Sequence, residues 1–238
     1  MKTIDIMLPV YYGNFDELEP SIRKQIAYYK ENLKDFKWTI VIAINGPLNK
    51  NEKIMCLAKD LSKKYEHVRY MHSPVAGKGS GIVNSWSASD ADILSYMDID
   101  LSTNLGCLRD IANGILTGYD LAIGSRYLKG SAIKRSFKRW FLSAAYHLIF
   151  TKLILSLKCK DAQCGFKAAS PKIKELLTLV KDKNWFFETE LLYLAQNKGY
   201  KIKEVPVIWT ENKFSGVKLW TAIPQFVKKS LELRLRKA

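Results

Sequence analysis

The sequence is poor in the residues that build zinc sites and disulfide frameworks. Its 238 residues include four cysteines, which form no CxxC pair, and three scattered histidines. A structural zinc site takes about four closely spaced ligands of these two types, and reduced thiols are the norm in a cytosolic protein. The sequence therefore predicts no zinc site and four free thiols.

Internal repeats, low-complexity tracts and a secretory signal are also missing. In the first ten residues, MKTIDIMLPV, one lysine precedes an alternating apolar pattern that is too short for the hydrophobic core of a signal peptide. The longest candidate membrane span, 141–157, has 17 residues and includes His147 and Lys152, whereas a spanning helix needs about 20 apolar residues. With 47% hydrophobic and 26% charged residues, the composition is that of a folded globular protein without a clear transmembrane helix.

Acidic residues are absent from one long stretch of the chain. Residues 121–160 contain nine Lys or Arg and no Asp or Glu, and residues 213–238 contain seven basic residues and one acid. These two segments account for the whole net charge of +15. The basic residues lie beside long aliphatic runs, without a recognition-helix motif or a base-stacking platform. The charge therefore favours an anionic membrane surface as partner and argues against nucleic acid, which we keep as a remote alternative.

Short apolar runs alternate with amphipathic stretches in the first half of the chain. Length and β-branched content predict strands at 3–10, 38–44, 68–72, 93–98 and 119–124. The stretches between them predict helices at 16–32, 50–64, 80–87 and 105–116. This order predicts an α/β fold with a mostly parallel sheet and helices on both faces. Ligands of such sheets bind beyond the carboxyl ends of the strands.

Two later segments combine apolar and basic residues. Residues 137–157 carry a polar stripe at four-residue steps, which is typical of an amphipathic helix. The stripe consists of Arg139, Ser143, His147 and Thr151. We expect this helix to lie in the headgroup plane of a membrane, and a helix packed in the protein core is the alternative. Residues 219–235 mix aromatic and aliphatic residues with Lys and Arg, which predicts a second surface-lying helix.

Two carboxylates, Asp98 and Asp100, stand at the end of the strand predicted at 93–98. Side chains two residues apart in an extended chain point to the same side, so the pair can hold a hard divalent cation such as Mg²⁺ or Mn²⁺. A metal bound there neutralises a leaving diphosphate. Because an Asp-x-Asp triplet often arises by chance, a solvated pair of acids in a surface loop is the alternative interpretation.

Other polar residues follow other predicted strands and are expected at the same edge of the sheet. The Gly-Lys-Gly triplet at 77–79 places a cation just before a predicted helix, where anions are favoured, although the rest of an NTPase P-loop is missing. Arg126 follows the fifth predicted strand, and arginine suits bidentate phosphate contacts. Tyr11 and Asn45 follow the first and second strands. Their shared position indicates a ligand site.

The ordered series LPVY, GKG, MDIDLS, GSRY, DAQCGFKA, FFETELL and EVPVIW resembles the family 2 glycosyltransferases of the GT-A fold. Within them it looks most like the dolichyl-phosphate mannose synthases and dolichyl-phosphate β-glucosyltransferases. The resemblance covers residues 3 to about 218 and implies a Rossmann-like GT-A catalytic domain at 1–212. It also implies an acceptor and membrane-facing helical segment at 131–158. The remainder, 213–238, would form a donor-closing loop and a basic amphipathic helix.

Matching the chain to the family pattern implies roles for individual residues. The implied donor-binding residues are Pro9, Tyr11, Glu17, Asn45, Lys78, Asp98, Lys213 and Lys218. The implied acceptor-binding residues are Ser131, Arg135 and Arg139. The implied catalytic residues are Asp98, Asp100, Arg126 and Arg139. Asp100 is implied as the principal metal ligand, with Asp98 as second ligand and contact to the nucleotide sugar.

The sequence departs from the family pattern at the nucleotide end. Relatives usually read Asn-Glu after the Tyr and Asp-Asp-Gly-Ser after the second strand, whereas this chain has YGNFDE at 12–17 and INGP at 44–47. Glu17 and Asn45 are therefore only candidate contacts to the base. Ser102 stands where some relatives have a further side chain near the metal or the phosphates.

The resemblance implies metal-dependent, inverting transfer of a hexose to a polyprenyl or dolichyl phosphate at the cytoplasmic face of a membrane. The motifs DAQCGFKA and FFETELLYLA favour UDP-glucose as donor, with GDP-mannose next, and Mg²⁺ or Mn²⁺ as cofactor. Whether a separate membrane subunit takes part stays open. The alternative acceptor is a hydroxyl of a glycan or glycolipid, which needs a base such as Glu188 or Glu190. Both glutamates also fit a structural role early in a helix.

Overall fold

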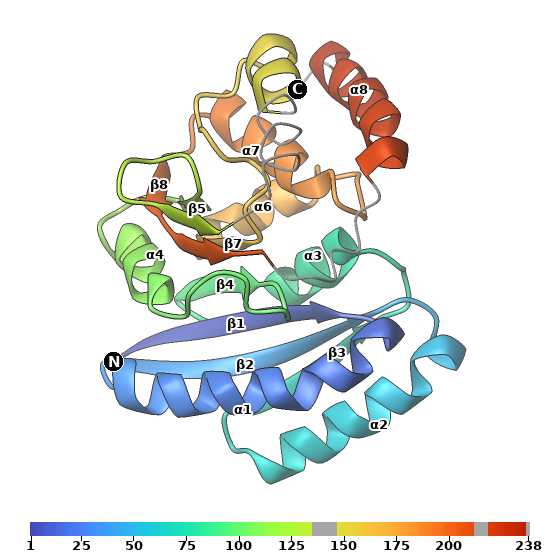
Figure 1. Ribbon diagram of the computed structural model, residues 1–238, viewed down its shortest axis with the longest axis vertical. Helices are drawn as coiled ribbons and strands as arrows, with labels where there is room; N and C mark the ends of the chain where they lie inside the picture. The colour runs from blue at the N-terminus through green and yellow to red at the C-terminus, as the bar shows by residue number, and fades with distance from the viewer. Residues whose placement is uncertain (135–146, 212–218, 237–238) are drawn as a thin grey trace.

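The computed structural model describes residues 1–134, 147–211 and 219–236, and a seven-stranded sheet lies at its centre (Figure 1). The strand order is β3-β2-β1-β4-β7-β5-β8. Strand β7 runs antiparallel to both neighbours, and the other pairs are parallel. In chain order the strands are β1 (Lys2–Val10), β2 (Phe36–Asn45), β3 (Val68–Ser73), β4 (Ile93–Met97), β5 (Leu121–Ser125), β7 (Phe166–Ala169) and β8 (Ile202–Pro206).

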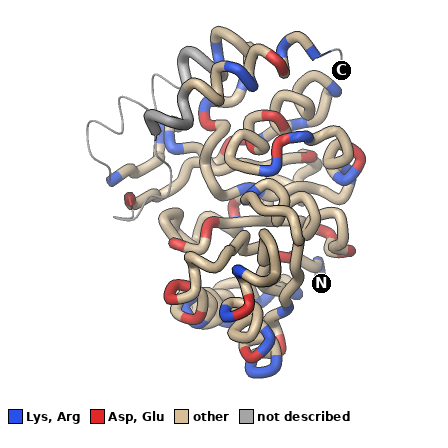
Figure 2. Tube along the Cα trace, turned by 90° about the vertical axis from the view of Figure 1, so that its right-hand side faces the viewer, with Lys and Arg blue, Asp and Glu red and all other residues tan. Residues whose placement is uncertain are grey.

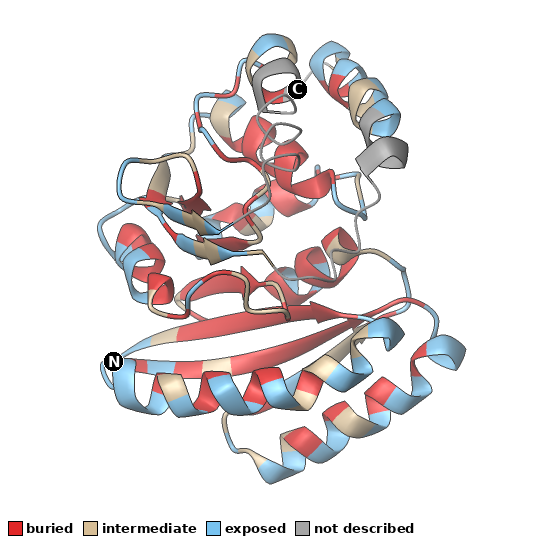
Figure 3. Ribbon diagram, in the orientation of Figure 1, coloured by how far each residue is buried: buried red, intermediate tan, exposed pale blue. Residues whose placement is uncertain are grey.

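Helices cover both faces of this sheet. Ile4, Ile6 and Leu8 of β1 belong to one core cluster, while Met7 belongs to the other, because successive side chains of a strand point to opposite faces. The first cluster includes residues of α1 (Phe15–Asn32), α2 (Leu48–Lys64) and α4 (Cys107–Leu116). The second includes residues of α3 (Lys78–Ala88), α6 (Lys174–Leu177) and α7 (Phe187–Asn197). Figure 3 shows the buried strands between them, and the predicted fold class is confirmed.

The predicted strands and helices of the first half are all present, with ends that differ from the prediction by at most two residues. Helix α3 begins at Lys78, two residues before its predicted start at Ser80. Gly77 precedes it with a φ of 122°, a conformation that glycine adopts far more readily than other residues. The sharp turn at Gly77 fixes Lys78 in the first turn of the helix, at the carboxyl edge of the sheet.

The second half of the sheet contains strands that the sequence pattern did not predict. Strand β7 has only four residues, FKAA, and its register pairs Lys167 with Tyr96 of β4 and Ile123 of β5. A strand this short, with a lysine inside it, lacks the apolar alternation that reveals longer strands. Its insertion separates β4 from β5 and brings the segment before it beside the end of β4.

A second, two-stranded sheet lies next to the loop that contains Asp100. Strands β6 (Ala132–Lys134) and β9 (Ile208–Thr210) are parallel, and Thr103 forms an antiparallel bridge with Trp209. The backbone N–H of Thr210 donates to the carbonyl of Ser102 at 2.8 Å. The small sheet therefore anchors the chain that leaves the Asp pair.

The two basic, apolar segments are described in part. Of 137–157, residues 137–146 lie outside the described residues, and His147–Ile154 form a π-helix, η2. The predicted C-terminal helix is present as α8 (Leu219–Leu235), and its Ser230 and Leu233 are buried. The remaining short elements are η1 (Tyr12–Asn14) and η3 (Pro171–Ile173). Within the described ranges, every helix is too short or too polar to cross a membrane.

Candidate active site

Asp98 directly follows β4 and is held against the segment that enters β7. Its backbone N–H donates to the carbonyl of Gly165 at 3.1 Å. A Cβ at Gly165 would lie 1.8 Å from Oδ2 of Asp98, so a side chain at position 165 would displace the carboxylate. The Asp98 side chain keeps 40% of its exposure, so the carboxylate is fixed in place and open to a ligand.

Asp100 is oriented by the turn that it starts. Its two carboxylate oxygens accept hydrogen bonds from the backbone N–H of Ser102 at 3.0 Å and from the Ser102 hydroxyl at 2.7 Å. Leu101 between them has a φ of 52°, in the left-handed region. Desolvation and the nearby charges of Glu188 and Asp100 raise the pKa of Asp98, against the attraction of Lys78. The negative charge of Asp100 therefore acts on Asp98.

Lys78 brings a cation to the Asp pair. Its side chain is buried, and its Nζ lies 2.7 Å from Oδ1 of Asp98 and 3.0 Å from Oε1 of Glu188. The rings of Tyr96 and Trp185 flank the ammonium group at 5.3 and 5.2 Å. Desolvation by itself lowers the pKa of Lys78, but the two carboxylates outweigh it and raise the pKa above its ordinary value. The lysine therefore stays charged at neutral pH.

A buried polar cluster, which was not predicted from the sequence, lies next to Lys78. Glu188 of α7 accepts a hydrogen bond from the Tyr96 hydroxyl, and Nζ of Lys167 lies 3.2 Å from the same hydroxyl and 3.7 Å from Glu188. Desolvation would raise the pKa of Glu188, but Lys167, Lys78 and Tyr96 hold it below its usual value. The available signal was the lysine within the otherwise apolar run FKAA.

The residues expected at the nucleotide end support the backbone around them. Asn45 donates to the carbonyl of Val10 at 2.8 Å and accepts from the N–H of Gly77 at 3.0 Å, which joins the ends of β1 and β2 to the start of α3. Pro9 is buried in β1, opposite Ala43 of β2. For Asn45 and Pro9, contact with the base stays a prediction.

Tyr11 and Glu17 lie just beyond β1. Tyr11 is 45% exposed, and its ring packs edge-on against that of Tyr12 with 5.1 Å between the centroids. Glu17 accepts a hydrogen bond from the side chain of Asn14 at 2.9 Å. Asn14 in turn accepts from the N–H of Tyr11 at 3.1 Å. These contacts place both residues on one short turn at the carboxyl edge, and their base contacts stay predictions.

Arg126, which was expected to contact phosphate, is engaged by a carboxylate of the protein itself. It is buried, and its Nε and Nη2 donate to the two oxygens of Asp161 at 2.7 and 2.9 Å. Trp209 covers the guanidinium at 5.5 Å. Asp161, 35 positions further along the chain, folds back onto the guanidinium and takes up its hydrogen bonds. Arg126 joins β5 to the segment before β7, and its phosphate contact stays a prediction.

The predicted acceptor residues are only partly described. Ser131 donates its hydroxyl hydrogen to the carbonyl of Ser125 at 2.7 Å and accepts from the N–H of Val207 at 3.3 Å. Its hydroxyl therefore supports the chain between β5 and β6. The other predicted basic contacts lie outside the described residues, and their roles stay predictions. They are Arg135, Arg139, Lys213 and Lys218.

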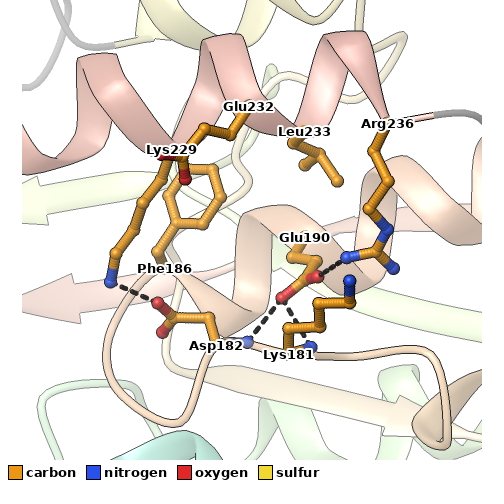
Figure 4. Close-up of a pocket in the computed structure, with 8 residues that line it drawn as sticks. All are labelled: Lys181, Asp182, Phe186, Glu190, Lys229, Glu232, Leu233 and Arg236. Atoms are coloured by element: carbon orange, nitrogen blue, oxygen red, sulfur yellow. Dashed lines mark hydrogen bonds and ion pairs between the residues drawn. The ribbon is translucent and has the colours of Figure 1, made fainter.

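Glu190, two residues after Glu188, faces a different part of the molecule. It accepts hydrogen bonds from the backbone N–H groups of Lys181 and Asp182 at 3.1 and 2.8 Å, and from Arg236 of α8 at 2.7 Å (Figure 4). Lys229 pairs with Asp182 beside it. These residues border a hollow of about 430 Å³ between α7 and α8. Of the predicted donor and metal residues that the structure describes, none lines the hollow.

The Asp pair suits a cation that takes the rest of its ligands from substrate. Over residues 1–134, 147–211 and 219–236 there is no cluster of three or more His, Cys, Asp and Glu with the geometry of a metal site. Mg²⁺ is commonly held by one or two carboxylates together with water and substrate phosphates. Asp98 and Asp100 are donors of this type, one open and one oriented, so they fit a metal bound with a diphosphate.

Comparison with known sequences assigns the family. The model of glycosyl transferase family 2 matches residues 6–175. The chain belongs to this family. The resemblance stated from the motifs is thereby confirmed, and the Asp pair, Lys78 and Arg126 all lie within the matched residues.

The curated relatives of this family 2 member are longer than the chain itself. Glycosyltransferase AglD of Haloferax volcanii is 31% identical over 209 residues, which are 87% of this chain and 33% of AglD. The dolichyl-phosphate beta-glucosyltransferase of Dictyostelium discoideum is 29% identical over 98% of this chain and 74% of that protein. The polyprenol monophosphomannose synthase of Mycolicibacterium smegmatis is 29% identical over 61% of this chain and 58% of that protein. This chain thus spans one third of AglD and up to about three quarters of the others.

Solved structures support the fold. The glucosyl-3-phosphoglycerate synthase of Mycobacterium tuberculosis, crystallised with Mn²⁺, UDP and phosphoglyceric acid, has a TM-score of 0.70 and 19% identity to this family 2 chain. The match covers 100% of this chain and 80% of that one. The likeness confirms the GT-A type of α/β fold that the motifs implied.

Proposed function

We propose that this chain is the catalytic part of an inverting glycosyltransferase that moves a hexose from a nucleotide sugar to a polyprenyl or dolichyl phosphate. The observation that carries the proposal is the carboxyl edge of the sheet, where Lys78 pairs with an open Asp98 next to an oriented Asp100. A cation beside two carboxylates suits a diphosphate bound with Mg²⁺ or Mn²⁺. UDP-glucose is the favoured donor, since several relatives are named dolichyl-phosphate beta-glucosyltransferase.

In the proposed reaction an oxygen of the lipid phosphate forms a bond to the anomeric carbon as the bond from that carbon to the diphosphate breaks, with inversion. Asp98 and Asp100 would hold the divalent cation, which neutralises charge on the departing diphosphate. Lys78 adds a fixed positive charge at the same place. Since an ionised phosphate is already a nucleophile, the chain's main contribution is to position both substrates and stabilise charge.

The engagement of the two glutamates favours a phosphate acceptor over a hydroxyl. Glu188 is buried, paired with Lys78 and bonded to Tyr96. Glu190 accepts hydrogen bonds from Arg236 and from two backbone N–H groups. A general base must reach the proton that it removes, and a carboxylate tied up in this way is a poor base. Neither glutamate is therefore placed to act as the general base that a hydroxyl acceptor needs.

The acceptor's membrane is proposed to contact the region of α8 and η2, which touch each other (Figure 1). Leu231 and Leu235 of α8 are 48% and 81% exposed, and Leu153 of η2 is also exposed. Lys228 and Arg234, both exposed, accompany them on α8, and Figure 2 shows Lys and Arg along the segment that ends at C. Exposed leucines next to basic residues suit an anionic leaflet, for which we propose the cytoplasmic face.

A product assay tests the function. The protein is incubated with Mg²⁺ or Mn²⁺, a short polyprenyl phosphate, and UDP-glucose or GDP-mannose in separate reactions, and the lipid product is identified by mass spectrometry. We expect a glucosyl phosphoryl lipid from UDP-glucose. Mannosyl product alone would identify GDP-mannose as the donor. In parallel reactions that also contain a glycan acceptor, transfer to its hydroxyl with none to the lipid phosphate would overturn the proposal.

A further inference from the structure

Lys78 contacts two carboxylates that differ in their access to a ligand. The Asp98 side chain is 40% exposed, whereas that of Glu188 is 2% exposed. A nucleotide sugar with its cation can reach Asp98 and draw on its charge, but it cannot reach Glu188. The counter-ion that stays with Lys78 during binding is therefore Glu188.

Glu188 is itself fixed from several sides. The Tyr96 hydroxyl donates to it from β4, and Lys167 of β7 lies 3.7 Å away with its side chain fully buried. Burying an ion carries a large desolvation cost that a fold recovers only with good partners, and clusters of buried charge gather at functional sites. The desolvation cost of burying two lysines and a glutamate next to Asp98 therefore favours a functional role for the cluster over packing alone.

The backbone links Glu188 to the turn that carries Lys78. The N–H of Ser80 in α3 donates to the carbonyl of Lys183, just before α7, at 3.0 Å. A Cβ at Gly77 would lie 2.0 Å from that carbonyl oxygen, and a Cβ at Gly79 would lie 2.7 Å from Cβ of Phe187. The start of α3 therefore packs closely against the segment that leads into α7. This contact fixes the positions of Lys78 and Glu188 relative to each other.

We propose that Glu188 is a positioning residue of the donor site, which holds Lys78 at the diphosphate when the donor engages Asp98. Lys167 and Tyr96 orient Glu188, and Glu188 orients Lys78. This inference rests on the proposed function, because it takes the ligand at Asp98 to be a nucleoside diphosphate sugar. It adds a buried group, out of reach of substrate, that sets the affinity for the donor.

Calorimetric titration with UDP, with and without Mn²⁺, tests the inference on Glu188→Gln. The matched control is Glu190→Gln, which makes the same change at a buried, ion-paired glutamate of the same helix. We expect UDP binding to weaken about tenfold in Glu188→Gln and by less than about twofold in Glu190→Gln. In the transfer assay the KM for the donor should rise in Glu188→Gln while the KM for the acceptor stays unchanged.

A double variant separates positioning from stability. Glu188→Gln leaves Lys167 buried without its carboxylate, so the variant is expected to lose stability as well. Combining it with Lys167→Met restores the charge balance and fills a similar volume. We expect the double variant to regain thermal stability while UDP binding stays weak. If binding returns together with stability, Glu188 has a structural role only and the inference fails.

The outcomes distinguish the inference from the function on which it rests. If the wild-type protein with Mn²⁺ does not bind UDP, GDP or their hexose conjugates, both the proposed function and the inference fail. If the wild-type protein binds UDP and Glu188→Gln binds it equally well, the inference alone fails. A loss of the same size in Glu190→Gln would also overturn it, since any buried ion pair of α7 would then have the same effect.

Discussion

Helix α7 carries two buried glutamates that look alike and serve different regions of the molecule. Glu188 pairs with Lys78 beside Asp98, and Glu190 pairs with Arg236 of α8. Residues two apart on a helix do not face each other, so one helix can hold the donor edge of the sheet with one side and the C-terminal helix with another. Burial and ion pairing alone therefore do not mark a functional residue. What distinguishes Glu188 is the open Asp98 that shares its lysine.

The largest effect is expected at the Asp pair itself. Asp100→Ala removes the oriented carboxylate and should lower transfer by about a thousandfold. The fold should stay intact, because among the described residues the hydrogen bonds of this carboxylate go to Ser102 of the same turn. Transfer rates with polyprenyl phosphate measure the loss of activity, and circular dichroism checks that the fold is intact. Near-normal rates in a well-folded Asp100→Ala protein would contradict the metal role.

The next largest effect is expected at Lys78. Lys78→Met removes the cation that pairs with Asp98, so UDP binding should weaken by about a hundredfold. Lys183→Met, in the exposed loop before α7, is the control and should bind UDP like the wild type. Equal UDP affinities of the wild type and Lys78→Met in a calorimetric titration would place the diphosphate elsewhere.

On the other side of α7, the expected effect is on stability. Arg236→Ala removes the partner of Glu190 and a contact with the carbonyl of Leu179, and should reduce the free energy of unfolding by about 2 kcal/mol. UDP affinity should change by less than about twofold. Urea unfolding and UDP titration of the same sample check both. A parallel fall in UDP affinity would mean that the two sides of α7 are coupled.

The smallest effect is expected in the acid range. The pKa of Glu188 is lowered in the folded protein, so the ionised group contributes stability above its unfolded pKa of about 4.3, and this contribution is lost as the pH falls below that value. Glu188→Gln cannot lose it, so its stability should depend less on pH below about pH 4. Urea unfolding midpoints of the wild type and of Glu188→Gln, measured between about pH 3 and 7, give the dependence of stability on pH. Identical acid slopes in both proteins would contradict the lowered pKa.

Most of the fold could be predicted because its first half obeys local rules. Each strand from β1 to β5 has five or more residues, and a helix separates each from the next. Strand β7 could not be predicted, since its four residues enclose Lys167 and its place between β4 and β5 depends on tertiary packing. Helix α8 was found from its pattern, but its docking against Glu190 was not.

The candidate site was predictable where position in the fold decides it. Asp98 and Lys78 follow directly from strand ends and a Gly-Lys-Gly turn, and the structure brings them to 2.7 Å. The pairing of Arg126 with Asp161 could not be predicted, because Asp161 comes from a distant segment that shows no periodicity. The cluster around Glu188 escaped for the same reason, as its members come from three separate elements.

A crystal structure of the protein with Mn²⁺ and UDP would show where the donor diphosphate binds. We expect an anomalous peak for Mn²⁺ in contact with Asp100, with Lys78 at the diphosphate and still paired with Glu188. UDP bound instead in the hollow between α7 and α8, beside Glu190 and Arg236, would contradict this expectation.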